Sequence, residues 1–219
     1  MNLKVIAYAR NGHTDKFGIP RQSREDSPIV TRIVFEPEYR IKDSLRAIDG
    51  FSHLWLLWGF NKVDSWSPTV RPPRLGGNRR VGVFATRSPF RPNPIGLSSV
   101  RLLAIDEGDL IVSGADLLDG TPIYDIKPYL SFSDSHEDAK NGFADETKDY
   151  RLKVDWKRLD NGSALSAKWL DDASYILSQD PRPAYQEDPS REYKLDYAGF
   201  TITFTVEGQT VHVKNIEKK

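Results

Sequence analysis

The chain has 219 residues and carries 31 acidic and 31 basic side chains, so its formal net charge is zero. A hydrophobic content of 38% and a charged content of 28% are typical of a folded protein and argue against disorder. No apolar run approaches the ~20 residues that cross a bilayer, and no secretion signal begins the chain, so we expect no membrane contact and a cytoplasmic location. The absence of cysteine and the scattering of the four histidines argue against disulfides and a bound metal.

Strand-like segments dominate the first half of the chain. Residues 3–9 and 29–35 are rich in residues that suit a pleated sheet. Residues 43–48 predict a short helix with Asp43 as its N-cap. Residues 51–60 are almost wholly apolar, which predicts a central strand buried on both faces.

The second half adds strands and one helix. Residues 82–86 and 99–106 predict strands, and the latter forms a hairpin with residues 110–115. The acidic segment 131–149 predicts a mobile crossing to a second unit, although its role stays unassigned. Residues 163–178 have a helical period, and residues 200–216 form a terminal hairpin.

The fold class that follows is mainly β. No alternating βαβ pattern is present, so a doubly wound α/β fold is not expected. We expect a β-barrel domain over residues 1–150 and a small α+β domain over residues 151–219.

Positive charge is concentrated in one stretch of this neutral chain. Between Ser65 and Ile105 there is no acidic residue, whereas seven arginines are present. Because an arginine fork matches carboxylates, phosphates and base edges, the stretch predicts an anionic or nucleic-acid ligand. The seven are Arg71, Arg74, Arg79, Arg80, Arg87, Arg91 and Arg101.

The most distinctive part of this stretch is Gly82-Val83-Phe84-Ala85-Thr86-Arg87-Ser88-Pro89-Phe90-Arg91-Pro92-Asn93-Pro94-Ile95-Gly96-Leu97. Its prolines prevent a helix, so we expect an ordered loop at the surface or along a cleft. A solvated loop whose arginines pair with carboxylates elsewhere is the alternative. No GxGxxG or GxxxxGK[ST] motif occurs, which argues against a Rossmann or P-loop nucleotide site.

A second polar segment spans residues 119–129. Asp119-Gly120-Thr121-Pro122 predicts a tight turn that leads into an extended run. Alternate side chains of an extended run share a face, which would align Asp125, Lys127 and Tyr129 for proton transfer or ligand binding. An edge strand with a surface ion pair is the alternative.

Together these motifs resemble the TsaA-like (TrmO/YaeB) family. Further matches are Pro20-Arg21-Gln22, Phe51-Ser52-His53-Leu54-Trp55 and Asp180-Pro181-Arg182-Pro183. The resemblance implies a single-sheeted β-barrel that dimerises and binds S-adenosyl-L-methionine without a Rossmann domain. It implies a tRNA (adenine(37)-N6)-methyltransferase that converts threonylcarbamoyladenosine beside the anticodon to its N6-methyl form.

The resemblance also implies roles for individual residues. Those expected at the cofactor are Pro20, Arg21, Gln22, His53, Leu54, Arg87, Leu97, Asp119, Gly120, Thr121, Pro122, Ile123 and Tyr124. Those expected at the tRNA are Arg71, Arg74, Arg79, Arg80, Arg91, Asn93 and Arg182. Asp125, Lys127 and Tyr129 are the catalytic candidates. A methyltransferase with another acceptor and a non-catalytic RNA-binding β-barrel are the competing hypotheses.

Overall fold

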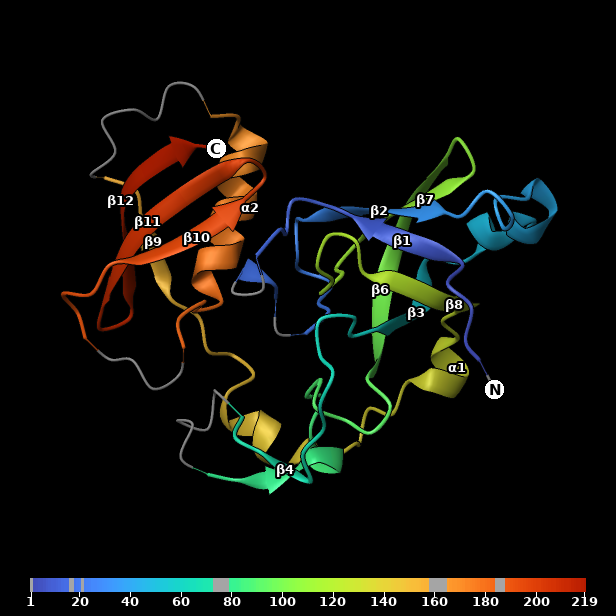
Figure 1. Cartoon of the computed structure of the whole chain (residues 1–219), viewed down its shortest axis with the longest axis horizontal. Helices are drawn as coiled ribbons and strands as arrows, with labels where there is room; N and C mark the ends of the chain where they lie inside the picture. Colours follow the sequence, from blue (N-terminus) through green and yellow to red (C-terminus); the bar gives the residue numbers. More distant parts are fainter. Residues whose placement is uncertain (1, 16–17, 21, 73–78, 158–164, 184–187) are drawn as a thin grey trace.

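The first sheet of the computed structural model closes into a barrel (Figure 1). The structure describes residues 2–15, 18–20, 22–72, 79–157, 165–183 and 188–219. Within them the barrel order is β1-β2-β7-β6-β3-β8, and every neighbouring pair is antiparallel. Its strands are β1 (Ala7–Arg10), β2 (Val30–Phe35), β3 (His53–Gly59), β6 (Ile95–Asp106), β7 (Asp109–Ser113) and β8 (Pro122–Pro128).

Strand β3 pairs with β6 and β8 in this barrel, but only one of its faces is buried. Leu54 and Leu56 are fully buried in the barrel, whereas Trp55 and Leu57 are partly exposed on the other face. The prediction of a strand buried on both faces is therefore wrong. In a small barrel the inward side chains fill the interior, and nothing in the described chain covers the outer face completely.

The β6–β7 hairpin confirms the predicted connection. Glu107 and Gly108 both have positive φ angles, 51° and 81°, as a two-residue type I′ turn requires. Strand β6 begins at Ile95, earlier than the predicted residue 99. The proline-rich loop therefore runs directly into the longest strand of the barrel.

Two short elements differ from the sequence prediction. In place of one helix over residues 43–48, two 3₁₀ turns span Lys42–Leu45 and Ile48–Gly50, because Ala47 between them has a positive φ of 68°. In place of a strand over residues 82–86, β5 (Val81–Gly82) pairs with β4 (Thr69–Val70) and a 3₁₀ turn follows at Val83–Ala85.

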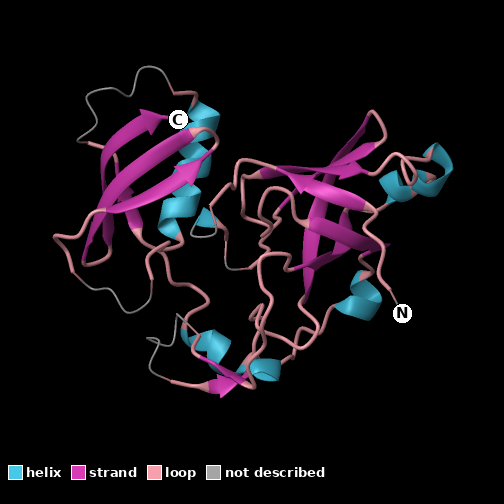
Figure 2. Cartoon of the chain, in the orientation of Figure 1, coloured by secondary structure: helices cyan, strands magenta, loops and turns pink. Residues whose placement is uncertain are grey.

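The second sheet has the order β10-β11-β12-β9 and packs against one helix (Figure 2). Ser166 caps the helix, because its Oγ accepts from the Trp169 amide at 3.1 Å. The predicted helix and terminal hairpin are confirmed within the described residues. The elements are β9 (Lys153–Asp155), α2 (Ala167–Ser178), β10 (Tyr193–Tyr197), β11 (Phe200–Glu207) and β12 (Thr210–Lys218).

The acidic crossing between the sheets contains short helical turns. Helix α1 (Ser131–Asp134) follows β8, and a 3₁₀ turn occupies Gly142–Glu146. The predicted domain boundary near residue 150 lies between β8 and β9, the strands that end one sheet and begin the other. No helix of the described chain is long and apolar enough to span a membrane.

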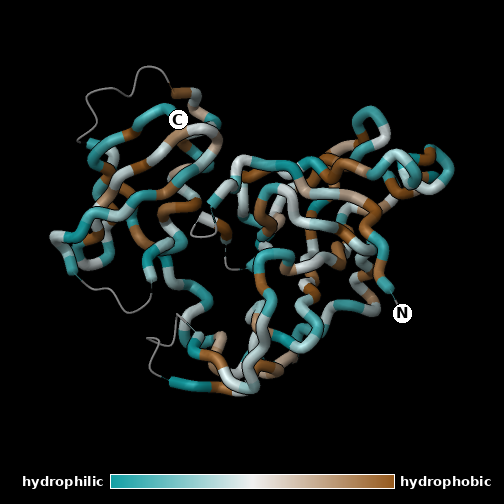
Figure 3. The backbone as a smooth tube through the Cα atoms, viewed as in Figure 1, coloured by the Kyte–Doolittle hydropathy of each residue, from teal (hydrophilic) through white to brown (hydrophobic). Residues whose placement is uncertain are grey.

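Each sheet has its own hydrophobic core, and apolar segments recur along the strands of both (Figure 3). Ile29 belongs to the second core although it precedes β2 of the barrel. Gly18 likewise packs against Leu195 and Ile176. The predicted fold class, a mainly β chain with a barrel and a smaller α+β part, is confirmed.

Candidate functional site

The outer face of β6, β3 and β8 brings several predicted site residues into rows. Leu97 pairs with Leu57, which pairs with Asp125, and in the next outward row Ser99, Trp55 and Lys127 are partners. Directly opposed residues of neighbouring strands point to the same face of a sheet. Leu97, Asp125 and Lys127 therefore lie on one face outside the barrel core.

The predicted catalytic residues share this face, but two of them neutralise each other. Lys127 Nζ lies 2.8 Å from Asp125 Oδ2, and Asp125 Oδ1 accepts from the Ile126 amide at 2.9 Å. Tyr129 follows the strand, with its ring 5.4 Å from that of Trp55 and 6.2 Å from that of His53. The arrangement offers a carboxylate, an ammonium and a phenol along one surface.

His53 lies at the other end of β3 from the Leu97 row. His53 pairs with Arg101. It lies four residues along β3 from Leu57, a separation of about 13 Å at the rise of a strand. The His53 ring contacts Ser52 Oγ at 2.9 Å and Glu25 Oε1 at 3.8 Å. Leu54 is fully buried, so only its backbone can contact a ligand. The cofactor residues predicted on β3 are thus apart from Leu97.

The predicted turn at Asp119 is held rigidly by the N-terminal segment. The Asp119 amide donates to the His13 carbonyl at 2.9 Å, and the Gly120 amide donates to the Ala9 carbonyl at 2.8 Å. Asp119 Oδ1 accepts from the Asn11 amide at 3.0 Å. The turn is therefore preorganised for contact with a ligand.

Burial divides the residues of this turn. Thr121, Pro122 and Ile123 are buried, so a ligand can reach their backbone at most. Asp119, Gly120 and Tyr124 are partly exposed, and the Tyr124 hydroxyl packs over Gly59. The accessible groups of the turn are a carboxylate, a phenol and backbone atoms.

Arg87 and Gln22 form a contact across 65 residues of sequence. Arg87 Nη1 donates to Gln22 Oε1 at 2.7 Å, and both residues are exposed. Pro20 beside them is buried, whereas Arg21 lies outside the described residues. The contact joins two motifs that the sequence analysis assigned separately to the cofactor.

A buried polar chain near this contact escaped the sequence analysis. Trp58 Nε1 donates to Ser98 Oγ at 2.9 Å, and Ser98 Oγ donates to Asp116 Oδ1 at 2.5 Å. Burial raises the pKa of the Asp116 carboxyl, although Ser98 and the positive charge of Arg87 oppose the rise. Ser98 lies between Gly96 and Val100 on the inward face of β6, and a serine at an inward position was the available signal.

Three of the arginines predicted to bind phosphates flank the short β4–β5 arm. Arg71, Arg79 and Arg80 are exposed, and Arg80 Nε donates to Thr69 Oγ1 at 2.9 Å. Arg74 lies outside the described residues. Figure 1 shows the labelled strand β4 away from both large sheets.

Arg91, Asn93 and Arg182 differ in how available they are to a substrate. Arg91 Nη1 donates to the carbonyls of Thr86 at 2.6 Å and Val83 at 3.2 Å, so it fastens its own loop. Asn93 is exposed. Arg182 is only 13% exposed and donates two bonds of 2.8 Å to Asp180. The Arg182 guanidinium is thus paired and largely covered, and its role at the tRNA stays a prediction.

The described residues contain no group of three His, Asp or Glu side chains that could hold a metal ion. The polar groups gathered near the barrel instead suit a charged organic ligand. They combine an exposed guanidinium, a partly buried carboxyl and an apolar Leu97 that is 52% exposed.

Comparisons with known proteins agree with these motifs. The chain matches the family model of the tRNA-methyltransferase O N-terminal domain over residues 8–135 and that of the TrmO C-terminal domain over residues 172–219. It is 48% identical to a tRNA (adenine(37)-N6)-methyltransferase of Eikenella corrodens, over 72% of this chain and 92% of the relative.

Two proteins of Pseudomonas aeruginosa extend the likeness. One, a putative S-adenosylmethionine-dependent methyltransferase, is 42% identical over 88% of this chain and 87% of its own. The other is TrmO, whose crystal structure superposes on this chain with a TM-score of 0.80 and 30% identity, over 99% of this chain and 98% of that one. The chain therefore belongs to the TrmO family of tRNA methyltransferases.

Proposed function

We propose that this chain transfers a methyl group from S-adenosyl-L-methionine to N6 of threonylcarbamoyladenosine at position 37 of tRNA. The observation that carries the proposal is the family match over residues 8–135, which covers the barrel and the arginine loop. The Arg87–Gln22 contact supports it, because two motifs far apart in sequence meet there.

The groups on the barrel fit such a cofactor. Arg87 offers a guanidinium for a carboxylate, and the turn after Leu118 offers rigid backbone groups for an adenine edge. Leu97 supplies apolar surface. When bound, S-adenosyl-L-methionine supplies an electrophilic methyl on a sulfonium.

Much of the rate enhancement in such a displacement comes from alignment of the two reactants. The chain must also remove the proton from N6. We assign this network to Asp125, Lys127 and Tyr129, since Lys127 neutralises the Asp125 carboxylate and Tyr129 adds a hydroxyl along the same face. A positioned acid–base group of this kind contributes about 10²–10⁴-fold to a rate.

The tRNA would approach the barrel along the β4–β5 arm. We propose that Arg71, Arg79 and Arg80 bind phosphates of the anticodon loop, where position 37 is unpaired and accessible. Binding of this kind weakens steeply with salt. We propose that the reaction takes place on tRNA in the cytoplasm.

We also propose that the protein acts as a homodimer. Strand β6 leaves large apolar side chains exposed at Ile95, Leu97, Leu103 and Ile105. A β-bulge between Leu102 and Ala104 separates Ile95 and Leu97 from Ile105, so these side chains do not form one row. Exposed apolar surface is nevertheless what oligomers commonly bury. Sedimentation or light scattering of the purified chain would give its mass in solution, and a monomer at micromolar concentration would refute this part.

The test of the reaction uses two forms of one tRNA. Purified protein and S-adenosyl-L-methionine are incubated with tRNA that carries threonylcarbamoyladenosine at position 37 or unmodified adenosine there, and nucleosides are read by mass spectrometry. We expect N6-methylation of the first tRNA only. Methylation of another nucleoside would favour a different acceptor, and failure to bind the cofactor would favour a non-catalytic RNA-binding module.

A further inference from the structure

The carboxyl of Asp116 is held in place from the core of the barrel. An indole N–H can only donate, so Ser98 Oγ accepts from Trp58 and directs its own proton to Asp116 Oδ1. Ser98 and Trp58 are both buried. One oxygen of the Asp116 carboxylate is thus fixed by a chain of donors that runs in a single direction.

The same carboxyl lies close to the Arg87–Gln22 contact, because the Arg24 amide donates to the Gly114 carbonyl at 3.1 Å and holds the segment after Gln22 against the one before Asp116. The positive charge of Arg87 and the backbone of Ser23, the residue after Gln22, both act on its ionisation. Arg87 nevertheless donates to Gln22 at 2.7 Å, and no ion pair joins it to Asp116 among the described residues. The Asp116 carboxyl and the Arg87 guanidinium therefore lie near one another without forming an ion pair.

Among the described residues, Asp116 makes no ion pair with a cation. Ser98 is its single side-chain donor in the part of the chain that the structure describes. Burial raises the pKa of this carboxyl, which is the sign of an ionised form with too little compensation. A cation supplied by a ligand would provide that compensation, whereas a second anion would not.

We propose that Asp116 and Arg87 hold the amino-acid end of S-adenosyl-L-methionine, with Asp116 accepting from its α-ammonium and Arg87 donating to its α-carboxylate. A zwitterion carries opposite charges on one carbon, so it needs an anion and a cation that are near each other and not paired. The inference rests on the proposed cofactor, and it makes Asp116 a binding residue that selects the ammonium group.

The experiment compares three ligands that share the thioadenosine part. S-adenosylhomocysteine carries both charged groups, its deaminated analogue keeps the carboxylate alone, and its decarboxylated analogue keeps the ammonium alone. Dissociation constants are measured by calorimetry for the native protein, Asp116→Asn and Arg87→Ala. A charge-assisted hydrogen bond is worth about 10–100-fold in affinity.

Asp116→Asn should weaken S-adenosylhomocysteine and the decarboxylated analogue by about tenfold or more and leave the deaminated analogue unchanged. Arg87→Ala should weaken S-adenosylhomocysteine and the deaminated analogue and leave the decarboxylated analogue unchanged. Equal weakening of all three ligands by Asp116→Asn would mean that the carboxyl only supports the fold, and no weakening would mean that it does not face the ligand. Either result overturns the inference.

Two controls separate binding from stability. Asp109 is a buried carboxyl of the same barrel, paired with Arg32 and Arg40, so Asp109→Asn should lower stability and leave all three affinities unchanged. Ser98→Ala keeps the carboxyl and removes its donor, and it should weaken the same two ligands less than Asp116→Asn does. If the native protein binds none of the three ligands, the proposed cofactor itself fails, which is a different result from a wrong selectivity pattern.

Discussion

His13 is the described residue whose burial is hardest to reconcile with its chemistry. It is 1% exposed, and neither ring nitrogen has a hydrogen-bond partner in the described chain. Its ring lies 5.4 Å from that of Tyr197, in the second domain. Burial lowers the pKa of His13 to about 4, because the charged imidazolium would lose its hydration.

This predicts a loss of stability in mild acid. The unfolded chain binds a proton at His13 near pH 6.5 and the folded chain only near pH 4, so unfolding takes up a proton between these values. We expect the free energy of unfolding to fall by about 2 kcal/mol between pH 7 and pH 5, with no further loss from this group below pH 4.

The measurement is urea unfolding at several pH values. His13→Gln should remove this part of the pH dependence, whereas the same change at the exposed His136 should leave it intact. An unchanged slope in His13→Gln would show that other groups cause the acid sensitivity.

Residue positions were predictable where a motif is local, and contacts were missed where the partners are distant. The Asp119 turn and the shared face of Asp125 and Lys127 follow from short-range backbone rules. The chain from Trp58 to Asp116 crosses three segments, and nothing in the local sequence pairs them. The burial of Arg182 was not predictable either, since it depends on the surrounding fold.

At the scale of elements, the long regular strands were predictable and the short irregular ones were not. Alternating residues and a two-residue turn define the β6–β7 hairpin locally. The 3₁₀ turns at Lys42–Leu45 and Val83–Ala85 have too few residues to show a period. The apolar run of β3 led to the wrong prediction of burial on both faces, because its outward residues are covered only in part.

Strand β6 depends on a close approach at Gly96. A Cβ added there would lie 2.2 Å from Trp58 Cε2, on the ring that donates to Ser98. Gly96→Ala must displace this indole, so we expect the free energy of unfolding to fall by about 1–3 kcal/mol. Chemical unfolding would measure the loss.

Gly50→Ala is the matched control, because a Cβ there has no neighbour within 4 Å. Its effect should stay within about 0.5 kcal/mol. A similar loss in both variants would mean that the close packing against Trp58 is not what requires glycine.

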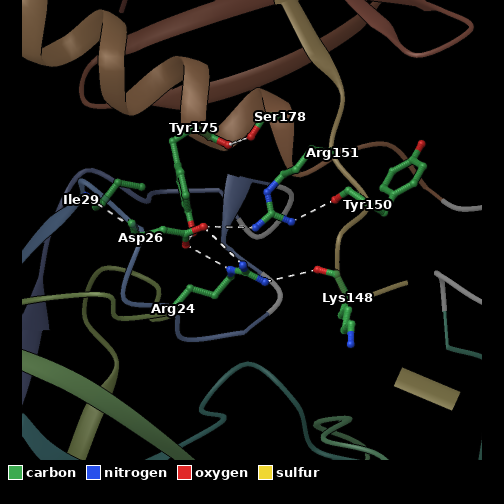
Figure 4. Close-up of polar contacts among 9 residues, drawn as sticks. Arg24, Asp26, Ile29, Lys148, Tyr150, Arg151, Tyr175 and Ser178 are labelled. Carbon is green, nitrogen blue, oxygen red and sulfur yellow. Dashed lines mark hydrogen bonds and ion pairs between the residues drawn. The ribbon is translucent and has the colours of Figure 1, made fainter. Parts of the chain in front are cut away.

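At the scale of the whole molecule, the two domains meet around Asp26 (Figure 4). Its carboxylate accepts from Arg24 Nε at 3.0 Å and from the Tyr175 hydroxyl of α2 at 3.2 Å, and Arg151 Nη2 lies 3.6 Å away. Arg24 also donates to the Lys148 carbonyl at 3.3 Å. The Asp26 side chain thus connects the segment before β2 to the crossing and to the second domain.

Asp26→Asn should weaken the docking of the two domains. Because the carboxylate is half exposed, we expect a loss of only about 1 kcal/mol in the free energy of unfolding. Asp43→Asn is the control, since in the described chain Asp43 pairs only with its exposed neighbour Arg46. Equal effects of the two changes in urea unfolding would show that the Asp26 cluster does not join the domains.

The packing of Gly12, Gly18 and Ile29 on the second domain has a consequence for biosynthesis. These residues leave the ribosome after β1 but before the other five barrel strands, whereas their partners Tyr197, Leu195 and Ile176 are translated after the whole barrel. The segment that holds the Asp119 turn therefore stays uncovered while the barrel forms. Ile29 is likewise exposed during this interval, and completion of the second domain buries it.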